Sequence, residues 1–154
     1  KGIRALLDDG VIAGYPMVDV KAVVYDGKHH PVDSKDIAFQ IAARNAFKEA
    51  VRDAKPVLLE PVMDVEILIP PETMGDISGD LNSRRGRIMG MDTVAGMQLI
   101  KAQAPQAELQ SYAADLQSIT GGEGSYTLAF SHYEAVPSHI ADKIIAAHKD
   151  TDEE

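Results

Sequence analysis

The chain has 154 residues, enough for one sizeable core or for two modules that are each close to the smallest stable size. It has no cysteine, which excludes disulfides and thiolate metal sites and fits a reducing compartment. No apolar run is long enough to cross a bilayer and the first ten residues lack the apolar core of a signal peptide, so we expect a cytoplasmic protein with no membrane partner. The formal net charge of −9 argues against a generic nucleic-acid binder, because such proteins usually carry a basic excess.

The charge is distributed unevenly along the chain. Residues 1–60 hold nine Lys/Arg and nine Asp/Glu, whereas residues 61–154 hold six and fifteen. Four of the fifteen acids lie in the tail, residues 150–154, which we expect to be a solvated end. The acidic excess therefore belongs to the second part of the chain.

The first 60 residues predict a strand, a helix and a strand. The chain opens on what resembles the last turns of a helix, so we expect a fragment of a longer protein. Residues 17–25 alternate between apolar and polar side chains, as a half-buried strand does. The last strand is predicted at residues 57–59. Two strands leave sheet edges uncovered, so we also expect that an exposed edge lets the fragment form a homo-oligomer.

One long helix separates these strands. A turn at Asp26-Gly27 opens a polar loop, residues 28–31, and Asp33 or Ser34 is predicted to cap a helix that starts near Ser34 and ends at Pro56. Apolar residues recur at three- and four-residue spacing and predict one buried face: Phe39, Ala42, Ala43, Ala46, Phe47, Ala50 and Ala54.

Pro61 marks a predicted boundary, and residues 61–154 form a second module. The predicted order is a strand at 63–69, a helix with Gly86 as its C′ residue, strands at 87–94 and 97–104 joined by Ala95-Gly96, a helix ending at Gly121-Gly122, and a strand around 126–130. This βαββαβ order is the split pattern of ferredoxin-like folds, and Pro137-Ser138 begins an added C-terminal helix. The predicted class is α+β, with a partial βαβ unit followed by a ferredoxin-like domain.

Several stretches, in order and at consistent separations, closely resemble bacterial translation elongation factor G. DGKHHPVDSKDIAFQIAARNAFKEA (26–50) and AKPVLLEP (54–61) resemble the second half of its domain IV. Residues 76–86, 112–118, 124–127 and 135–138 resemble its domain V. The resemblance covers nearly the whole chain. It divides the chain into the C-terminal half of domain IV, residues 1–60, and domain V, residues 61–154.

The resemblance implies a role on the ribosome. The family's domain IV tip enters the decoding site beside tRNA and messenger, so the tip residues implied to contact rRNA or tRNA are Lys28, His29, His30 and Asp33. His30 matches the family's tip histidine, whereas the family typically has an aromatic at the place of His29 and an acid at that of Pro31. A solvated loop is the alternative interpretation. A metal site is not expected, because adjacent imidazoles point apart and no third ligand is fixed nearby.

Two basic groups are further candidates for ribosome contact. Arg44, Lys48 and Arg52 lie four residues apart in one helical row, which indicates either a phosphate contact or a solvated face of mixed charge. Arg84, Arg85 and Arg87 stand out in an acidic module, and the similar arginines of the family lie near the large subunit's factor-binding region. The alternative there is charge compensation at a helix C-terminus.

No G-x-x-x-x-G-K-[ST] sequence is present, so the chain is not expected to bind nucleotide phosphates in the P-loop manner. The resemblance implies that this part of the parent is not an enzyme and holds no cofactor. By resemblance, GTP and Mg²⁺ belong to another domain of the parent GTPase. The predicted function is therefore the ribosome-binding C-terminal part of an elongation factor G-like protein that promotes translocation. Alternatives are a ribosomal-protection or recycling paralogue, or a small-molecule-binding regulatory module with a closed apolar pocket.

Overall fold

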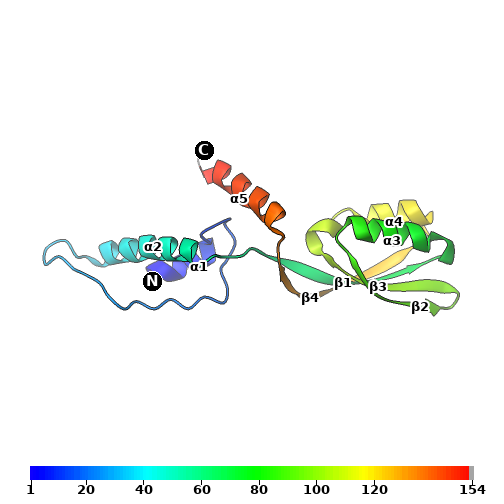
Figure 1. Ribbon diagram of the computed structural model, residues 1–154, viewed down its shortest axis with the longest axis horizontal. Helices are drawn as coiled ribbons and strands as arrows, with labels where there is room; N and C mark the ends of the chain where they lie inside the picture. The colour runs from blue at the N-terminus through cyan, green and yellow to red at the C-terminus, as the bar shows by residue number, and fades with distance from the viewer. Residues whose placement is uncertain (153–154) are drawn as a thin grey trace. The chain divides into compact units, whose positions relative to one another are not determined.

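The computed structural model describes residues 1–152, with side chains to residue 149, so the predicted solvated tail lies outside the described side chains. The chain divides into two compact units, one made of residues 1–58 with 137–154 and the other of residues 59–136. The fold class is α+β, as predicted, since helices accompany a single four-stranded sheet. Figure 1 shows the elements of both units.

The first unit contains helices α1 (Gly2–Asp9), α2 (Asp36–Asp53) and α5 (Ser138–Asp152). Its small core joins α1 and α2 through Leu6, Phe47 and Val51, with Ile3, Leu7, Val11 and Met17 packed around them. Gly2 makes this approach possible, because a Cβ there would lie 2.6 Å from the carbonyl oxygen of Gln40. Each fully buried side chain stabilises by roughly 1.5–3 kcal/mol before entropy is counted, so three of them make a marginal core.

The predicted strand at residues 17–25 is wrong. Residues 18–33 are all exposed and form no ladder in the described chain, although Met17 N–H donates to the Leu7 carbonyl at 2.7 Å. The alternation of side chains is real, but a strand needs a partner to satisfy its backbone groups. The second predicted strand, 57–59, is not separate either, because Leu59 is the first residue of β1 (Leu59–Ile69). The partial βαβ unit is therefore absent.

Two predictions about α2 also need correction. The helix begins at Asp36 after Lys35, which makes no side-chain cap, because the Ser34 hydroxyl instead accepts the N–H of His30. The predicted apolar face is mostly exposed: Phe39 is 49% accessible, and the buried residues are Phe47 and Val51. Contact with α1 rather than with a sheet selects this different face.

The second unit is an antiparallel sheet in the order β2-β3-β1-β4, built from β1, β2 (Arg87–Val94), β3 (Met97–Pro105) and β4 (Ser125–Ala135). Helices α3 (Met74–Ser83) and α4 (Tyr112–Thr120) lie on one face of it (Figure 1). Two 3₁₀ turns, η1 (Pro71–Thr73) and η2 (Gln106–Leu109), precede these helices. The predicted βαββαβ order is confirmed.

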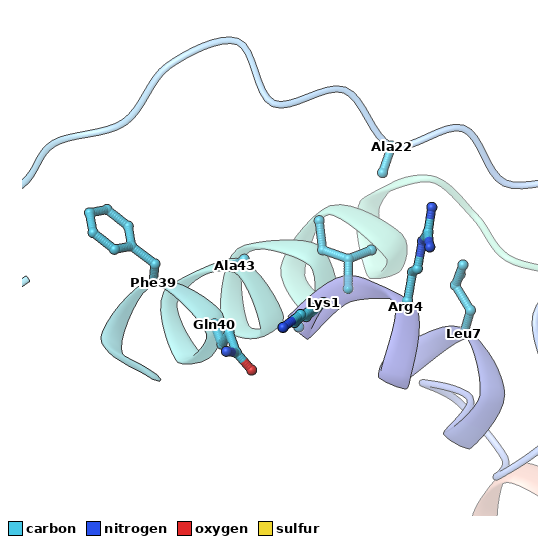
Figure 2. Close-up of a pocket in the computed structure, with 9 residues that line it drawn as sticks. Lys1, Arg4, Leu7, Ala22, Phe39, Gln40 and Ala43 are labelled. Carbon is cyan, nitrogen blue, oxygen red and sulfur yellow. The ribbon is translucent and has the colours of Figure 1, made fainter. Parts of the chain in front are cut away.

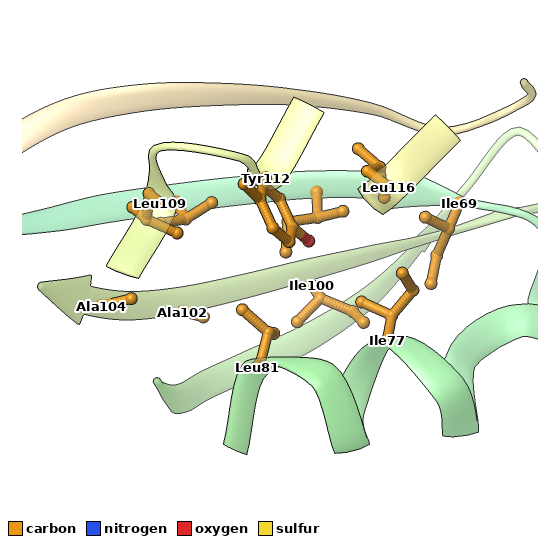
Figure 3. Packing of buried hydrophobic residues seen from close by; sticks show 11 residues of the cluster. Ile69, Ile77, Leu81, Ile100, Ala102, Ala104, Leu109, Tyr112 and Leu116 are labelled. Atoms are coloured by element: carbon orange, nitrogen blue, oxygen red, sulfur yellow. The ribbon is translucent and has the colours of Figure 1, made fainter. Parts of the chain in front are cut away.

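One continuous core holds the sheet to its two helices. Ile77 and Leu81 of α3 and Tyr112 and Leu116 of α4 point toward the strands, as Figure 3 shows. The strand residues of this core are Val65, Ile67, Ile69, Ile100, Ala102 and Ala104. Helical spacing in the sequence predicts these apolar stripes, and all their members are buried except the half-buried Met74 and the exposed Ala113: Met74, Ile77 and Leu81, and Leu109, Tyr112, Ala113 and Leu116. This core has eleven buried residues, whereas that of the first unit has three.

The turns of the second unit follow the predicted residues with one shift. Ala95 and Gly96 both have positive φ (51° and 84°) and join β2 to β3, as a tight hairpin requires. At the end of α3 the left-handed C′ residue is Arg85 (φ 58°) rather than Gly86. Gly86 is needed for another reason: its N–H donates to the Leu81 carbonyl at 2.7 Å, and a Cβ on Gly86 would lie only 2.7 Å from that oxygen.

The C-terminal helix is confirmed as α5, beginning at Ser138 after Pro137. Helical spacing in the sequence predicts an inward face made of Ile140, Ile144 and Ile145, and all three are half-buried. In the described part of the chain, no helix is long and apolar enough to cross a membrane.

Candidate nucleic-acid interface

The loop before α2 is held by its own short-range hydrogen bonds. Gly27 N–H donates to the Asp26 carboxylate at 2.7 Å, which fixes the turn that opens the loop. His30 N–H donates to the Ser34 hydroxyl at 2.6 Å, and Ser34 N–H returns a bond to the His30 carbonyl at 3.2 Å. These reciprocal bonds set the position of His30 relative to the start of α2.

The imidazole of His30 has two competing partners. Val32 N–H donates to Nδ1 at 3.3 Å, and Asp33 Oδ2 lies 3.4 Å from the same nitrogen. The first contact needs Nδ1 without a proton, and the second needs Nδ1 protonated. In either state the ring is oriented through Nδ1, so Nε2 is the nitrogen available to an external partner. The side chains of His30 and Asp33 are 66% and 82% exposed, as a contact surface requires.

The other tip residues are more open. Lys28 and His29 are exposed, and neither makes a side-chain contact among the described residues. The structure thus brings His30 and Asp33 together and leaves Lys28 and His29 projecting. No group of three His, Cys, Asp or Glu residues that could hold a metal ion occurs among the described residues.

The basic row of α2 is only partly engaged. Arg44 is half-buried, and its guanidinium lies 3.9 Å from Asp9 of α1. Lys48 and Arg52 are exposed and have no ion-pair partner in the described chain. Two of the three predicted positions therefore retain an uncommitted positive charge.

The arginines of the second unit are already paired within the unit. Arg84, whose side chain is 13% exposed, donates to Asp80 at 2.8 Å, to Asp115 at 2.5 Å and to the Glu108 carbonyl at 2.8 Å. Its guanidinium also lies 5.2 Å from the centre of the Tyr112 ring. The hydrogen bond to Asp80, opposed by partial burial and aided by Asp115, raises the pKa of Arg84.

Arg85 binds two carboxylates from two other elements. It meets both oxygens of Glu60 at 2.7 and 2.9 Å and Glu108 at 3.0 Å, joining the end of α3 to β1 and η2. These bonds, Glu60 first, raise its pKa despite partial burial. Sequence reasoning missed this network because none of its acids is near Arg85 in the chain.

Arg87 belongs to a separate polar group with Glu134 and His132 of β4. It donates to Glu134 at 2.6 Å, and Nε2 of His132 lies 2.8 Å from the same carboxylate oxygen. Hydrogen bonds from His132 and then from Arg87 lower the pKa of Glu134. Arg87 itself stays 57% exposed, unlike the two arginines before it.

The first unit has an open groove. It has a volume of about 450 Å³, is open to solvent, and lies between α1, α2 and Ala22, as Figure 2 shows. Its lining includes Ile3, Leu7, Phe39 and Ala43 together with Lys1, Arg4 and Gln40. This groove is open and lies in the first unit, whereas the regulatory-module alternative would need a closed apolar pocket.

Two family profiles match the chain, and they meet near residue 56, close to the point at residues 58–59 where the two compact units meet. The family profile described as "Elongation factor G C-terminus" matches residues 57–144, and the profile "Elongation factor G, domain IV" matches residues 1–55. A curated relative, Elongation factor G of Aquifex pyrophilus, is 52% identical over 145 residues. Those residues make up 94% of this chain but only 21% of the relative, so the chain spans about a fifth of its length.

A solved structure agrees with these sequence matches. The crystal structure of ttk003000868 from Thermus thermophilus superposes with a TM-score of 0.79 at 46% identity, covering 97% of this chain and 23% of that one. The ferredoxin-like unit, the helix that follows the tip loop, and the ordered sequence matches therefore have one explanation: the chain belongs to the elongation factor G family and corresponds to its domain IV and C-terminal region.

Proposed function

We propose that this chain is the ribosome-binding part of an elongation factor G-like translational GTPase, and that its tip loop enters the decoding site to promote movement of tRNA and messenger. The observation that carries the proposal is the tip itself: Lys28, His29 and His30 are exposed on a loop whose backbone is fixed by its own hydrogen bonds. Family membership over both units supports it.

The geometry suits RNA better than a small ligand. The hydrogen bonds around His30 orient its ring before contact, which lowers the entropic cost of binding at this residue, and Lys28 is exposed two residues before it. Lys28 can neutralise a phosphate. His30 can donate a hydrogen bond from Nε2 when the ring is cationic, or when it is neutral in the tautomer that the Val32 N–H bond to Nδ1 requires. Lys48 and Arg52 add positive charge along α2 behind the tip.

On this proposal the chain itself is not an enzyme. GTP and Mg²⁺ are assigned to another part of the parent protein, because no phosphate-binding loop is present in this sequence. The partners are rRNA and the tRNA–messenger pair at the tip, and the large subunit's factor-binding region for the second unit, in the cytoplasm. Calorimetry on the purified chain is expected to detect no saturable guanine-nucleotide binding.

The test uses the full-length parent protein with His30→Ala, and with His139→Ala as the matched control, because His139 is an exposed histidine on α5. Rapid mixing should show slower tRNA movement for His30→Ala while ribosome-stimulated GTP hydrolysis stays nearly unchanged. The control should match the wild type in both steps. If His30→Ala slows hydrolysis and movement equally, or slows neither, the tip does not act in tRNA movement.

The same variants separate translocation from the recycling and ribosomal-protection alternatives. If His30→Ala leaves movement intact but slows ribosome splitting, the chain belongs to a recycling paralogue. If it abolishes only rescue of drug-inhibited translation, the protection alternative holds. Both outcomes would overturn the translocation role while leaving family membership in place.

A further inference from the structure

Strand β4 has an unprotected outer edge. It is the last strand of the sheet and pairs with β1 on one side only within the described chain. Natural edge strands usually carry charges, prolines or bulges that prevent pairing with another chain. Residues 125–130, SYTLAF, have none of these, because the only irregularity in the β1–β4 pairing comes after Phe130. β2, the opposite edge, has Arg87, Asp92 and a bulge between Ile88 and Gly90.

One face of this edge is apolar and only half covered. Leu128 pairs with Val65, and Phe130 pairs with Met63, so both belong to the face that carries the helices. Yet Leu128 is 41% exposed and Phe130 is 56% exposed, with the Tyr133 ring 5.3 Å from that of Phe130. An additional strand with apolar side chains on this face would bury them.

The opposite face of the same edge is acidic. Thr127 and Ala129 are small, and their partners on β1 are Glu66 and Asp64, both exposed. Lys101 lies across from Glu66 on β3, but its ammonium is 3.5 Å from Asp92 and leaves Glu66 without an ion-pair partner in the described chain. Asp64 has only the Gln103 amide at 2.9 Å. Long basic side chains from an added strand could extend over the small residues to these carboxylates.

We propose that the outer edge of β4 binds an extended basic peptide segment of a partner protein as a fifth strand. Its apolar residues would cover Leu128 and Phe130. Its alternate lysines or arginines would lie beside Thr127 and Ala129 and extend across them toward Asp64 and Glu66, which are one strand further in. Main-chain hydrogen bonds provide affinity in this binding mode, and the alternating side chains provide specificity. The surface is separate from the tip loop, and the inference does not depend on decoding-site insertion.

Charge decides between this partner and a second copy of the chain. Residues 59–136 contain four Lys/Arg and eleven Asp/Glu, and all four cations have ion-pair partners within the unit. Two copies of this surface would repel each other, whereas a basic segment is attracted.

The test uses the purified chain and a synthetic peptide of alternating lysine and valine, about ten residues long and blocked at both ends. Binding is measured by fluorescence anisotropy, and hydrogen exchange of the amides is followed by NMR. We expect saturable binding that slows exchange of those amides of residues 125–130 that point away from β1, while the amides of β2 are unaffected. A peptide alternating glutamate and valine should bind at least about tenfold more weakly.

Two pairs of variants locate the site. Asp64→Asn with Glu66→Gln should weaken lysine-peptide binding by roughly threefold to tenfold, since cross-strand charge pairs are individually modest. Asp76→Asn with Glu72→Gln is the matched control, because it removes the same two charges from exposed positions in α3 and η1, away from the β4 strand. Likewise Phe130→Ser should weaken binding, whereas Met89→Ser, at an exposed apolar residue of β2, should not.

Each of four results would overturn the proposal. These are absence of binding, equal loss in the target and control variants, outward-pointing β4 amides that are already protected without peptide, and concentration-dependent self-association through β4. The third would mean that the chain covers its own edge, and the fourth that a second copy is the occupant.

Discussion

Arg85 offers a direct test of whether the arginines of the second unit are structural. Replacing it by alanine removes the paired bonds to Glu60 and the bond to Glu108, and leaves the Glu60 side chain, 13% exposed, without its cation. Breaking a buried pair costs about 3–5 kcal/mol, and exposed pairs contribute about 0–1 kcal/mol. Because the Arg85 side chain is 27% exposed, we expect a loss of about 2–3 kcal/mol in the unfolding free energy of this unit.

The backbone of Arg85 supplies an internal control. Its φ of 58° is left-handed, a conformation that is costly for residues with a Cβ and free for glycine. Arg85→Gly loses the same ion pairs but relieves this strain, so it should be about 1 kcal/mol more stable than Arg85→Ala. Native-state hydrogen exchange of β1 and β3 amides in increasing urea measures both variants in the unit concerned. Equal stability of alanine and wild type would refute the structural assignment, and equal stability of the two variants would refute the strain argument.

Three other predictions concern the second unit and its balance with the first. Tyr112→Phe should leave stability unchanged or raise it by about 1 kcal/mol in urea unfolding, because the buried Tyr112 hydroxyl has no hydrogen-bond partner among the described residues; a clear loss would mean that it is bonded. The hydrogen bonds from Arg84 and then Ser111 lower the pKa of Asp115. The ionised Asp115 therefore stabilises the folded state fully above the ordinary carboxylate pKa, and this stabilisation is lost as pH falls toward the lowered value. Asp115→Asn should make the unfolding free energy less dependent on pH in that acid range, and an unchanged pH profile would contradict this. Amides of α2 should exchange faster with solvent than those of β1 and β3, because the core between α1 and α2 has three buried side chains and the core of the second unit has eleven. Equal protection of these amides would show that the two units unfold together as one cooperative unit.

The ferredoxin-like unit was predictable from the sequence because its signals are local and agree with its tertiary structure. Ile77 and Leu81 share a helical stripe that packs onto a sheet present in the same chain. The first unit was less predictable for the opposite reason. Residues 17–25 have the alternation of a strand, and Phe39 has the spacing of a buried helix face. Among the described residues, however, no strand pairs with the former, and Phe39 stays 49% exposed. The periodicity of apolar residues indicates which face of a segment can be buried, but it does not indicate whether the chain contains an element that covers that face.

In the candidate site, too, features set by neighbouring residues could be predicted from the sequence, and contacts between distant residues could not. The exposure of Lys28 and His29 followed from a loop without apolar residues, and it is observed. The pairing of His30 with Ser34 and Val32 was not predicted, because Ser34 was assigned to capping α2. The partners of Arg85 could not be read from the sequence at all, since Glu60 and Glu108 are each more than twenty residues away.

These arrangements separate the positive charges of the chain into two kinds. Arg84 and Arg85 hold α3, η2 and β1 together, so their charge is neutralised where it lies. Lys28, Lys48 and Arg52 have no such partners in the described chain and remain exposed. A net charge of −9 therefore does not argue against RNA binding by residues 1–58, because residues 59–136 hold eleven Asp/Glu against four Lys/Arg and the remaining acidic excess lies in residues 137–154. Local uncommitted charge, rather than the average over the chain, determines which surface can approach a phosphate backbone.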